Sequence, residues 1–142
     1  MEAKVHSSVI QSIFRRKGGE GVYTKIINDE NITDYSNVLT LLPEDEKGLI
    51  IFFEGIENWL LLTEKRTLSL KNKTYSSIFH TDLVEVSMDI QEEFRNGIKD
   101  KNAFTRLLAV DINNKTHLLK IENGQPYHGV YQILHFLAAR NR

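Results

Sequence analysis

The fold of this chain is indicated by the stretch Trp59-Leu60-Leu61-Leu62-Thr63-Glu64-Lys65-Arg66-Thr67-Leu68-Ser69-Leu70. An apolar run over residues 59–63 is followed by three polar residues and then by a second short run over residues 67–70. Short apolar runs bounded by polar turns are typical of β-strands. We therefore predict two strands here, joined by a turn that contains Lys65 and Arg66.

The same pattern extends in both directions from this pair of strands. Further strands are expected at residues 49–53, 74–79, 83–90, 104–112 and 115–121. Residues 83–90 alternate, with Val84, Val86, Met88 and Ile90 on one face, which indicates one buried and one solvated side. No segment long enough for a helical crossover separates any of these seven strands, so we predict an antiparallel sandwich or barrel.

Two amphipathic helices are predicted at the two sides of this strand region. After Pro126, apolar residues recur at helical spacing: Tyr127, Val130, Tyr131, Leu134, Leu137 and Ala138. Ile133 lies at the margin of this stripe, and Phe136 lies outside it. Residues 3–17 form a second pattern, with Val5, Val9 and Ile13 widened by Ile10 and Phe14. We expect that helix to dock on the core, and a helix resting on a membrane is the alternative.

The remaining segments give weaker patterns. Residues 20–28 are expected to form a strand that ends in a polar turn. A short helix is expected after Asp34, and Pro43 would interrupt it. Residues 91–102 are polar and contain Gly97, so we predict a mobile loop.

Composition sets limits on the classes of protein and site. The chain has 142 residues, 41% of them hydrophobic, and a net charge of −1, which fits one globular domain over residues 1–142 with no general attraction to nucleic acid. It contains no cysteine, so disulfides, thiolate metal sites and cysteine nucleophiles are excluded. The start of the chain lacks the apolar core of a secretory signal, and we expect a cytoplasmic protein.

The order of the predicted elements resembles that of bacterial pleckstrin-homology-like (PH-like) domains. The residues that carry the resemblance are Leu41-Leu42-Pro43-Glu44, which look like a leader before the first strand, residues 59–70 with their Thr-x-x-Arg turn, and residues 77–86. The resemblance covers residues 41–139, so residues 1–40 would be an N-terminal helix and extension added to a PH-like core over residues 41–142. It implies an α+β fold with a curved, seven-stranded antiparallel sheet plugged by the last helix, and a role in binding.

Patterns that would indicate an enzyme are absent from the sequence. The five histidines are scattered, and His128 and His135 are two helical turns apart, too far for a shared metal ion. Ser77 and His80 lie close in sequence without an identifiable third partner. We therefore predict no catalytic residue, no metal ion and no cofactor, and the alternative is an enzyme that places His80 or His117 in a deep polar pocket.

Five residues are candidates for binding. Lys65 and Arg66 occupy one predicted turn and Lys71 and Lys73 the next, at opposite ends of a short strand. In PH-like domains that bind inositol phospholipids, basic residues gather near a loop between early strands, so the resemblance implies such a site at Lys71 and Lys73. Phe136 would mark a protein interface or pack on the N-terminal helix.

These residues lead to two functional predictions. The first is a non-catalytic module that recognises a protein partner, of a regulatory or immunity type. The alternative is a peripheral binder of anionic lipid or of a phosphorylated small molecule, which uses the basic turns. Solvated turn lysines are the simpler explanation of the same residues.

Overall fold

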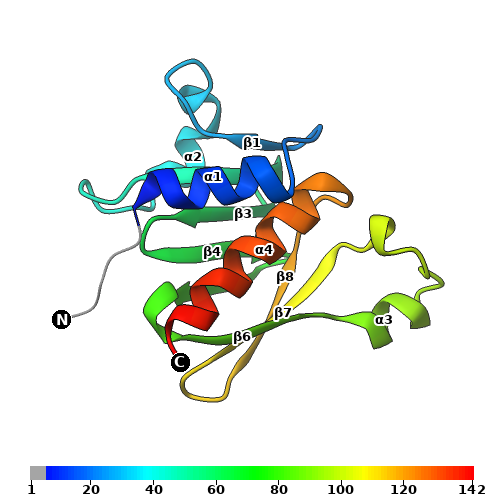
Figure 1. Cartoon of the computed structure of the whole chain (residues 1–142). Helices are drawn as coiled ribbons and strands as arrows, with labels where there is room; N and C mark the ends of the chain where they lie inside the picture. The colour runs from blue at the N-terminus through cyan, green and yellow to red at the C-terminus, as the bar shows by residue number, and fades with distance from the viewer. Residues whose placement is uncertain (1–5) are drawn as a thin grey trace.

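Eight strands in two antiparallel sheets carry the fold (Figure 1), in a computed structural model that describes residues 6–142. The first sheet contains, in spatial order, β1 (Thr24–Ile26), β2 (Gly48–Gly55), β3 (Asn58–Thr63), β4 (Arg66–Lys71) and β5 (Thr74–Phe79). The second contains β6 (Leu83–Met88), β7 (Arg106–Asp111) and β8 (Thr116–Lys120). The predicted antiparallel α+β class is confirmed.

The single seven-stranded sheet or barrel is not found. All seven strands expected after residue 48 are present, but they divide into four and three, and no ladder joins the two sheets within residues 6–142. The strand expected in residues 20–28 is β1, which pairs with the free edge of β2 as an eighth strand.

The two long helices are α1 (Ser7–Lys17) and α4 (Gln125–Arg140), which lie side by side (Figure 1). The shorter ones are η1 (Ile32–Tyr35), α2 (Ser36–Leu39), η2 (His80–Asp82), α3 (Ile90–Arg95) and η3 (Lys101–Ala103). Pro126 is in the first turn of α4, where its missing N–H costs no hydrogen bond, as predicted. No helix in the described part of the chain is long and apolar enough to cross a bilayer.

The helix α1 docks on the core as expected, with a narrower buried face than the predicted one. Its buried residues are Ile10, Ile13 and Phe14, whereas Val9 is exposed, and the predicted Val5 lies outside the described residues. Gly129 of α4 allows the close approach, since a Cβ there would lie 2.6 Å from Cδ1 of Phe14. Because Ile10, Ile13 and Phe14 are buried in this contact, they are not available to rest on a membrane as the alternative required.

The central strands β2 and β3 of the first sheet are buried on both faces. Ile50 and Leu60 point to the main core under α1 and α4, while Ile51 and Leu61 point to a second apolar layer on the outer face. That layer is covered by Tyr35 and its neighbours in η1 and α2. Burial on both faces explains why β2 and β3 are continuous apolar runs rather than alternating ones.

Two local predictions are corrected by the structure. In β6 the register shifts between Leu83 and Glu85, so Leu83 and Val86 face inward and Val84 is exposed. Residues 91–102, predicted to be a loop, include most of α3 and the start of η3 and form a lobe that projects from the end of β6 (Figure 1).

Candidate functional site

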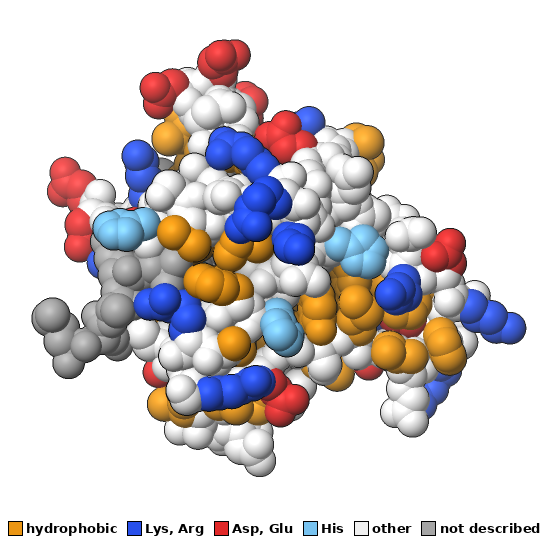
Figure 2. All heavy atoms as spheres, viewed as in Figure 1, with side chains coloured by type: hydrophobic (Ala, Val, Ile, Leu, Met, Phe, Trp, Pro, Cys, Tyr) orange, Lys and Arg blue, Asp and Glu red, His pale blue; other side chains and the backbone are white. Residues whose placement is uncertain are grey.

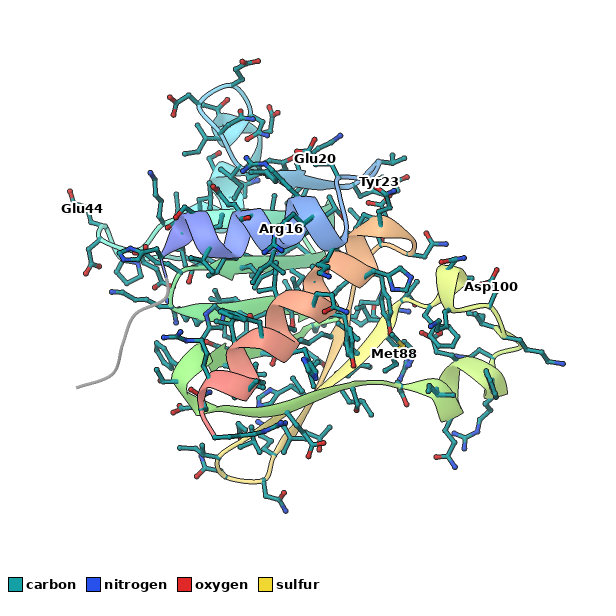
Figure 3. The ribbon with its side chains drawn as sticks, in the orientation of Figure 1. Arg16, Glu20, Tyr23, Glu44, Met88 and Asp100 are labelled. Carbon is teal, nitrogen blue, oxygen red and sulfur yellow. The ribbon has the colours of Figure 1, made fainter. Side chains whose placement is uncertain are left out.

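A hollow of about 420 Å³ lies where the ends of the two sheets meet, and we call it the inter-sheet hollow. Glu54, Asn58 and Lys71 line it from the first sheet, and Lys120 lines it from the second. Tyr23, just before β1, stands at the same end of the molecule as the lobe that carries Asp100, whereas Glu44 lies at the opposite end (Figure 3).

Two lysines, Lys71 and Lys120, contribute positive charges to the lining of the hollow. Neither Lys71 nor Lys120 has an ion pair among the described residues, and Lys120 Nζ donates a hydrogen bond of 3.3 Å to the neutral Thr105 Oγ1. Burial lowers the pKa of Lys120, and the positive charges of Lys71 and Arg106 lower it further, while the carboxylates of Glu93 and Glu54 offset part of this effect. An anion placed between the lysines would remove this unfavourable interaction between cations.

The carboxylates in the hollow already have hydrogen-bond donors. Both oxygens of Glu122 are used, at 2.7 Å from Val22 N, 2.9 Å from Tyr23 N and 2.8 Å from Thr24 Oγ1. Glu54 accepts a hydrogen bond from Asn58 Nδ2. The acidic side chains therefore hold the walls of the hollow together, while the lysines retain free donors.

A buried carboxylate also fixes the wall formed by Thr105. Glu93 of α3 is 0% exposed, and its Oε2 accepts hydrogen bonds from Thr105 N at 2.8 Å and Arg106 N at 2.9 Å. Arg106 Nε in turn lies 2.9 Å from Asp89 Oδ2. These contacts attach the lobe to the start of β7, next to Lys120.

Of the predicted binding residues, Lys65 and Arg66 lie at the other end of β4 from the hollow. Lys65 Nζ is 3.4 Å from Asp45 Oδ2, and Arg66 Nε is 3.0 Å from Glu46 Oε2. The Arg66 guanidinium also stacks over the Phe79 ring at 5.5 Å. The Thr-x-x-Arg turn thus binds the residues that precede β2.

Lys71 lines the hollow, and Lys73 follows it in the β4–β5 turn. Lys73 is exposed and has a φ of 70°, as required of the second central residue in a tight hairpin turn. Phe136 is half-buried and packs against the main core, with the Arg140 guanidinium 5.8 Å from its ring centre. The structure therefore brings only Lys71 of the five predicted residues into the hollow, and Lys120 was missed.

A set of three hydrogen-bonded side chains, outside the inter-sheet hollow, also joins the two sheets. Ser76 Oγ of β5 is 2.6 Å from His117 Nδ1 of β8, and His117 Nε2 is 2.9 Å from Asp111 Oδ2. Sequence reasoning missed this arrangement because Ser76 and His117 are 41 residues apart. The predicted hairpin was a usable signal for the other pair, since Asp111 and His117 flank its turn.

The other histidines have separate positions. His80 is buried with its Nε2 3.1 Å from Thr67 Oγ1, and the small hollow beside it, which Ile78 and Leu83 help to line, has no room for water. His128 Nε2 lies 3.4 Å from Asn102 Oδ1. No group of three metal-ligating side chains is present within residues 6–142.

Comparison of the chain with known proteins found no similar protein. No protein-family model, curated protein or solved structure matches the chain. The functional argument therefore rests on the geometry of its own side chains.

Proposed function

We propose that the chain is a binding domain of PH-like architecture that holds a phosphate-bearing ligand in the inter-sheet hollow. Four antiparallel strands (β2–β5), then three (β6–β8), then a covering helix (α4) support the architecture, with α1 and β1 as additions. The observation that carries the ligand proposal is the convergence of Lys71 and Lys120, from different sheets, on one hollow without an ion-pair partner among the described residues.

Phosphate suits this pair because it offers several strong acceptor oxygens and two negative charges. Each lysine ammonium has three donors, and the only hydrogen bond described for Lys120 Nζ is the one to Thr105 Oγ1. The rim of the hollow includes Val22, which is 75% exposed, and the neighbouring β2–β3 turn exposes 62% of Ile56. This apolar rim would also suit a phosphate presented by a lipid headgroup.

Binding of inositol hexakisphosphate, measured by calorimetry at two salt concentrations, tests the proposal. We expect Lys71→Gln and Lys120→Gln each to weaken binding about tenfold, since a hydrogen bond to a charged group contributes about 1.5 kcal/mol. Lys47→Gln, which changes an exposed lysine just before β2, is the matched control. Equal affinity of all four proteins would contradict the proposal.

Sedimentation with vesicles distinguishes the two sources of phosphate. A lipid-bound ligand predicts that the protein sediments with vesicles containing a phosphoinositide and that Ile56→Asp abolishes sedimentation while calorimetric binding remains. A soluble ligand predicts calorimetric binding without sedimentation.

A protein partner is the second candidate function, and a different surface supports it. The outer face of the second sheet exposes Val84, Ile112 and Leu118, next to the half-buried Leu108 and Val110. Exposed apolar patches of this kind mark interaction sites. If a stoichiometric partner binds there, Leu118→Lys abolishes its recovery and Lys71→Gln does not.

A further inference from the structure

Ser76, His117 and Asp111 form a continuous hydrogen-bonded chain across the gap between the two sheets. The two distances are 2.6 Å and 2.9 Å, and His117 is only 8% exposed, so the imidazole is held in place. Asp111, at the far end of this series of hydrogen bonds, is also held in place. Asp111 Oδ1 accepts hydrogen bonds from Asn113 N at 2.9 Å and from Lys115 N at 3.1 Å.

The positions of the protons follow from the acceptors. The hydrogen bond from His117 lowers the pKa of Asp111, and the Lys115 backbone N–H lowers it further, so the carboxylate is ionised and accepts only. His117 Nε2 must then carry the proton in that bond. In the neutral imidazole Nδ1 is left with a lone pair, and the Ser76 hydroxyl donates to it.

This is the arrangement of an activated nucleophile: a hydroxyl, a base that accepts its proton, and a third group that orients the base. The two ring nitrogens are exchanged relative to the serine protease triad, but each has the same role. The geometry points to Ser76 as an acyl-acceptor site, at which a small activated acyl donor such as a thioester transfers its acyl group to the serine hydroxyl.

The step balances without any further reagent. The Ser76 Oγ–carbonyl carbon bond forms as the Oγ proton moves to His117 Nδ1, and Asp111 stabilises the imidazolium. The carbon–sulfur bond then breaks, and the leaving thiolate takes the proton back from His117. The products are the serine ester and a free thiol.

The surroundings of Ser76 limit the donor and favour a stoichiometric reaction. Ser76 is half-buried and lies on β5, the edge strand of its sheet, whose outer backbone N–H groups are outside the ladder and can face a carbonyl oxygen. Neither the inter-sheet hollow nor a hollow of about 700 Å³ beside α1 is lined by Ser76 or His117. The donor that we infer is therefore one with a small acyl group.

Labelling of the intact chain with a small fluorophosphonate tests this inference, because the P–F bond is replaced by a stable Oγ–P bond. Peptide mass spectrometry is expected to place one adduct on Ser76 and none on Ser77, its neighbour on the opposite face of β5. His117→Gln is expected to slow labelling at least about 100-fold, as is typical for loss of a general base.

Two further variants separate reactivity from stability. Asp111→Asn keeps the shape of the chain of hydrogen bonds but should slow labelling, while Ser77→Ala should label at the rate of the unchanged protein. An unlabelled Ser76, or equal labelling rates in the folded His117→Gln variant, would overturn the inference. Binding of inositol hexakisphosphate by Ser76→Ala is expected to be unchanged, so this result is independent of the proposed ligand site.

Discussion

Glu46 and Arg66 form a buried ion pair in which Arg66 Nε lies 3.0 Å from Glu46 Oε2 and only 3% of the Glu46 side chain is exposed. The same carboxylate oxygen accepts a hydrogen bond of 2.7 Å from Thr63 Oγ1, whose oxygen also accepts from Lys65 N and Arg66 N. One carboxylate thus fixes both the β3–β4 turn and the segment before β2.

Replacing Glu46 by Gln is expected to lower the free energy of unfolding by about 3 kcal/mol, because Arg66, whose side chain is 16% exposed, loses its counter-charge. Urea unfolding measures the change. Glu44→Gln, at an exposed residue of the same segment, is the control and should change stability by less than about 0.5 kcal/mol. Equal stability of the two variants would mean that Arg66 is not needed as a structural residue and is available to a ligand.

Gly129→Ala is expected to destabilise the protein although alanine favours helices. A Cβ at this position would lie 2.6 Å from Phe14 Cδ1, so α1 and α4 would have to separate. Overpacking of this kind costs about 1–3 kcal/mol, more than the gain of about 1 kcal/mol in helix propensity. The free energy of unfolding measures the balance of these two effects. In the double variant, Phe14→Leu removes the ring that the new Cβ would meet, so it should restore part of the stability that Gly129→Ala loses. A more stable Gly129→Ala protein would contradict this packing.

Acid should destabilise the fold through His80. Burial lowers the pKa of His80 from 6.5 to about 4, and the Glu64 backbone and the Glu46 carboxylate offset only part of this effect. Between about pH 6.5 and pH 4 the unfolded chain binds a proton that the folded chain does not, so stability falls as the pH falls. The full difference is about 3 kcal/mol.

Urea unfolding at pH 7 and pH 4.5 measures this effect. In His80→Asn the dependence on pH across that window should become flatter, whereas His135→Asn, at an exposed histidine of α4, should leave it unchanged. A similar dependence in all three proteins would assign the loss of stability to other groups.

Sequence reasoning was most successful for strands and helices, which can be predicted from the hydrophobic pattern of their own residues. It located all eight strands and both long helices, because each is specified by its own residues. It failed at the β6 bulge, where the register shift makes Leu83 face the core in place of Val84, while Val86 and Met88 face the core as predicted. It also treated Val9 as part of a buried stripe, because the partner that selects Ile10, Ile13 and Phe14 is α4, far away in sequence.

The candidate site depended on long-range placement and was less predictable. Lys71 was recognised as a turn lysine, but Lys120 carries no signal until the ends of the two sheets are brought together. Conversely, Lys65 and Arg66 looked free in sequence, and the carboxylates of Asp45 and Glu46, 20 residues earlier in each case, pair with them. Pairing between distant charges cannot be read from periodicity.

The sheets and the helices differ in when they can form. Every ladder joins strands that are adjacent in sequence, and the β2–β3, β3–β4, β4–β5 and β7–β8 hairpins close over loops of two to four residues. The helix α1, by contrast, is covered by α4, which is made more than 100 residues later. During synthesis on the ribosome, Ile10, Ile13 and Phe14 therefore stay uncovered until α4 has emerged, and a chaperone that shields apolar helices would have its longest access at this N-terminal segment.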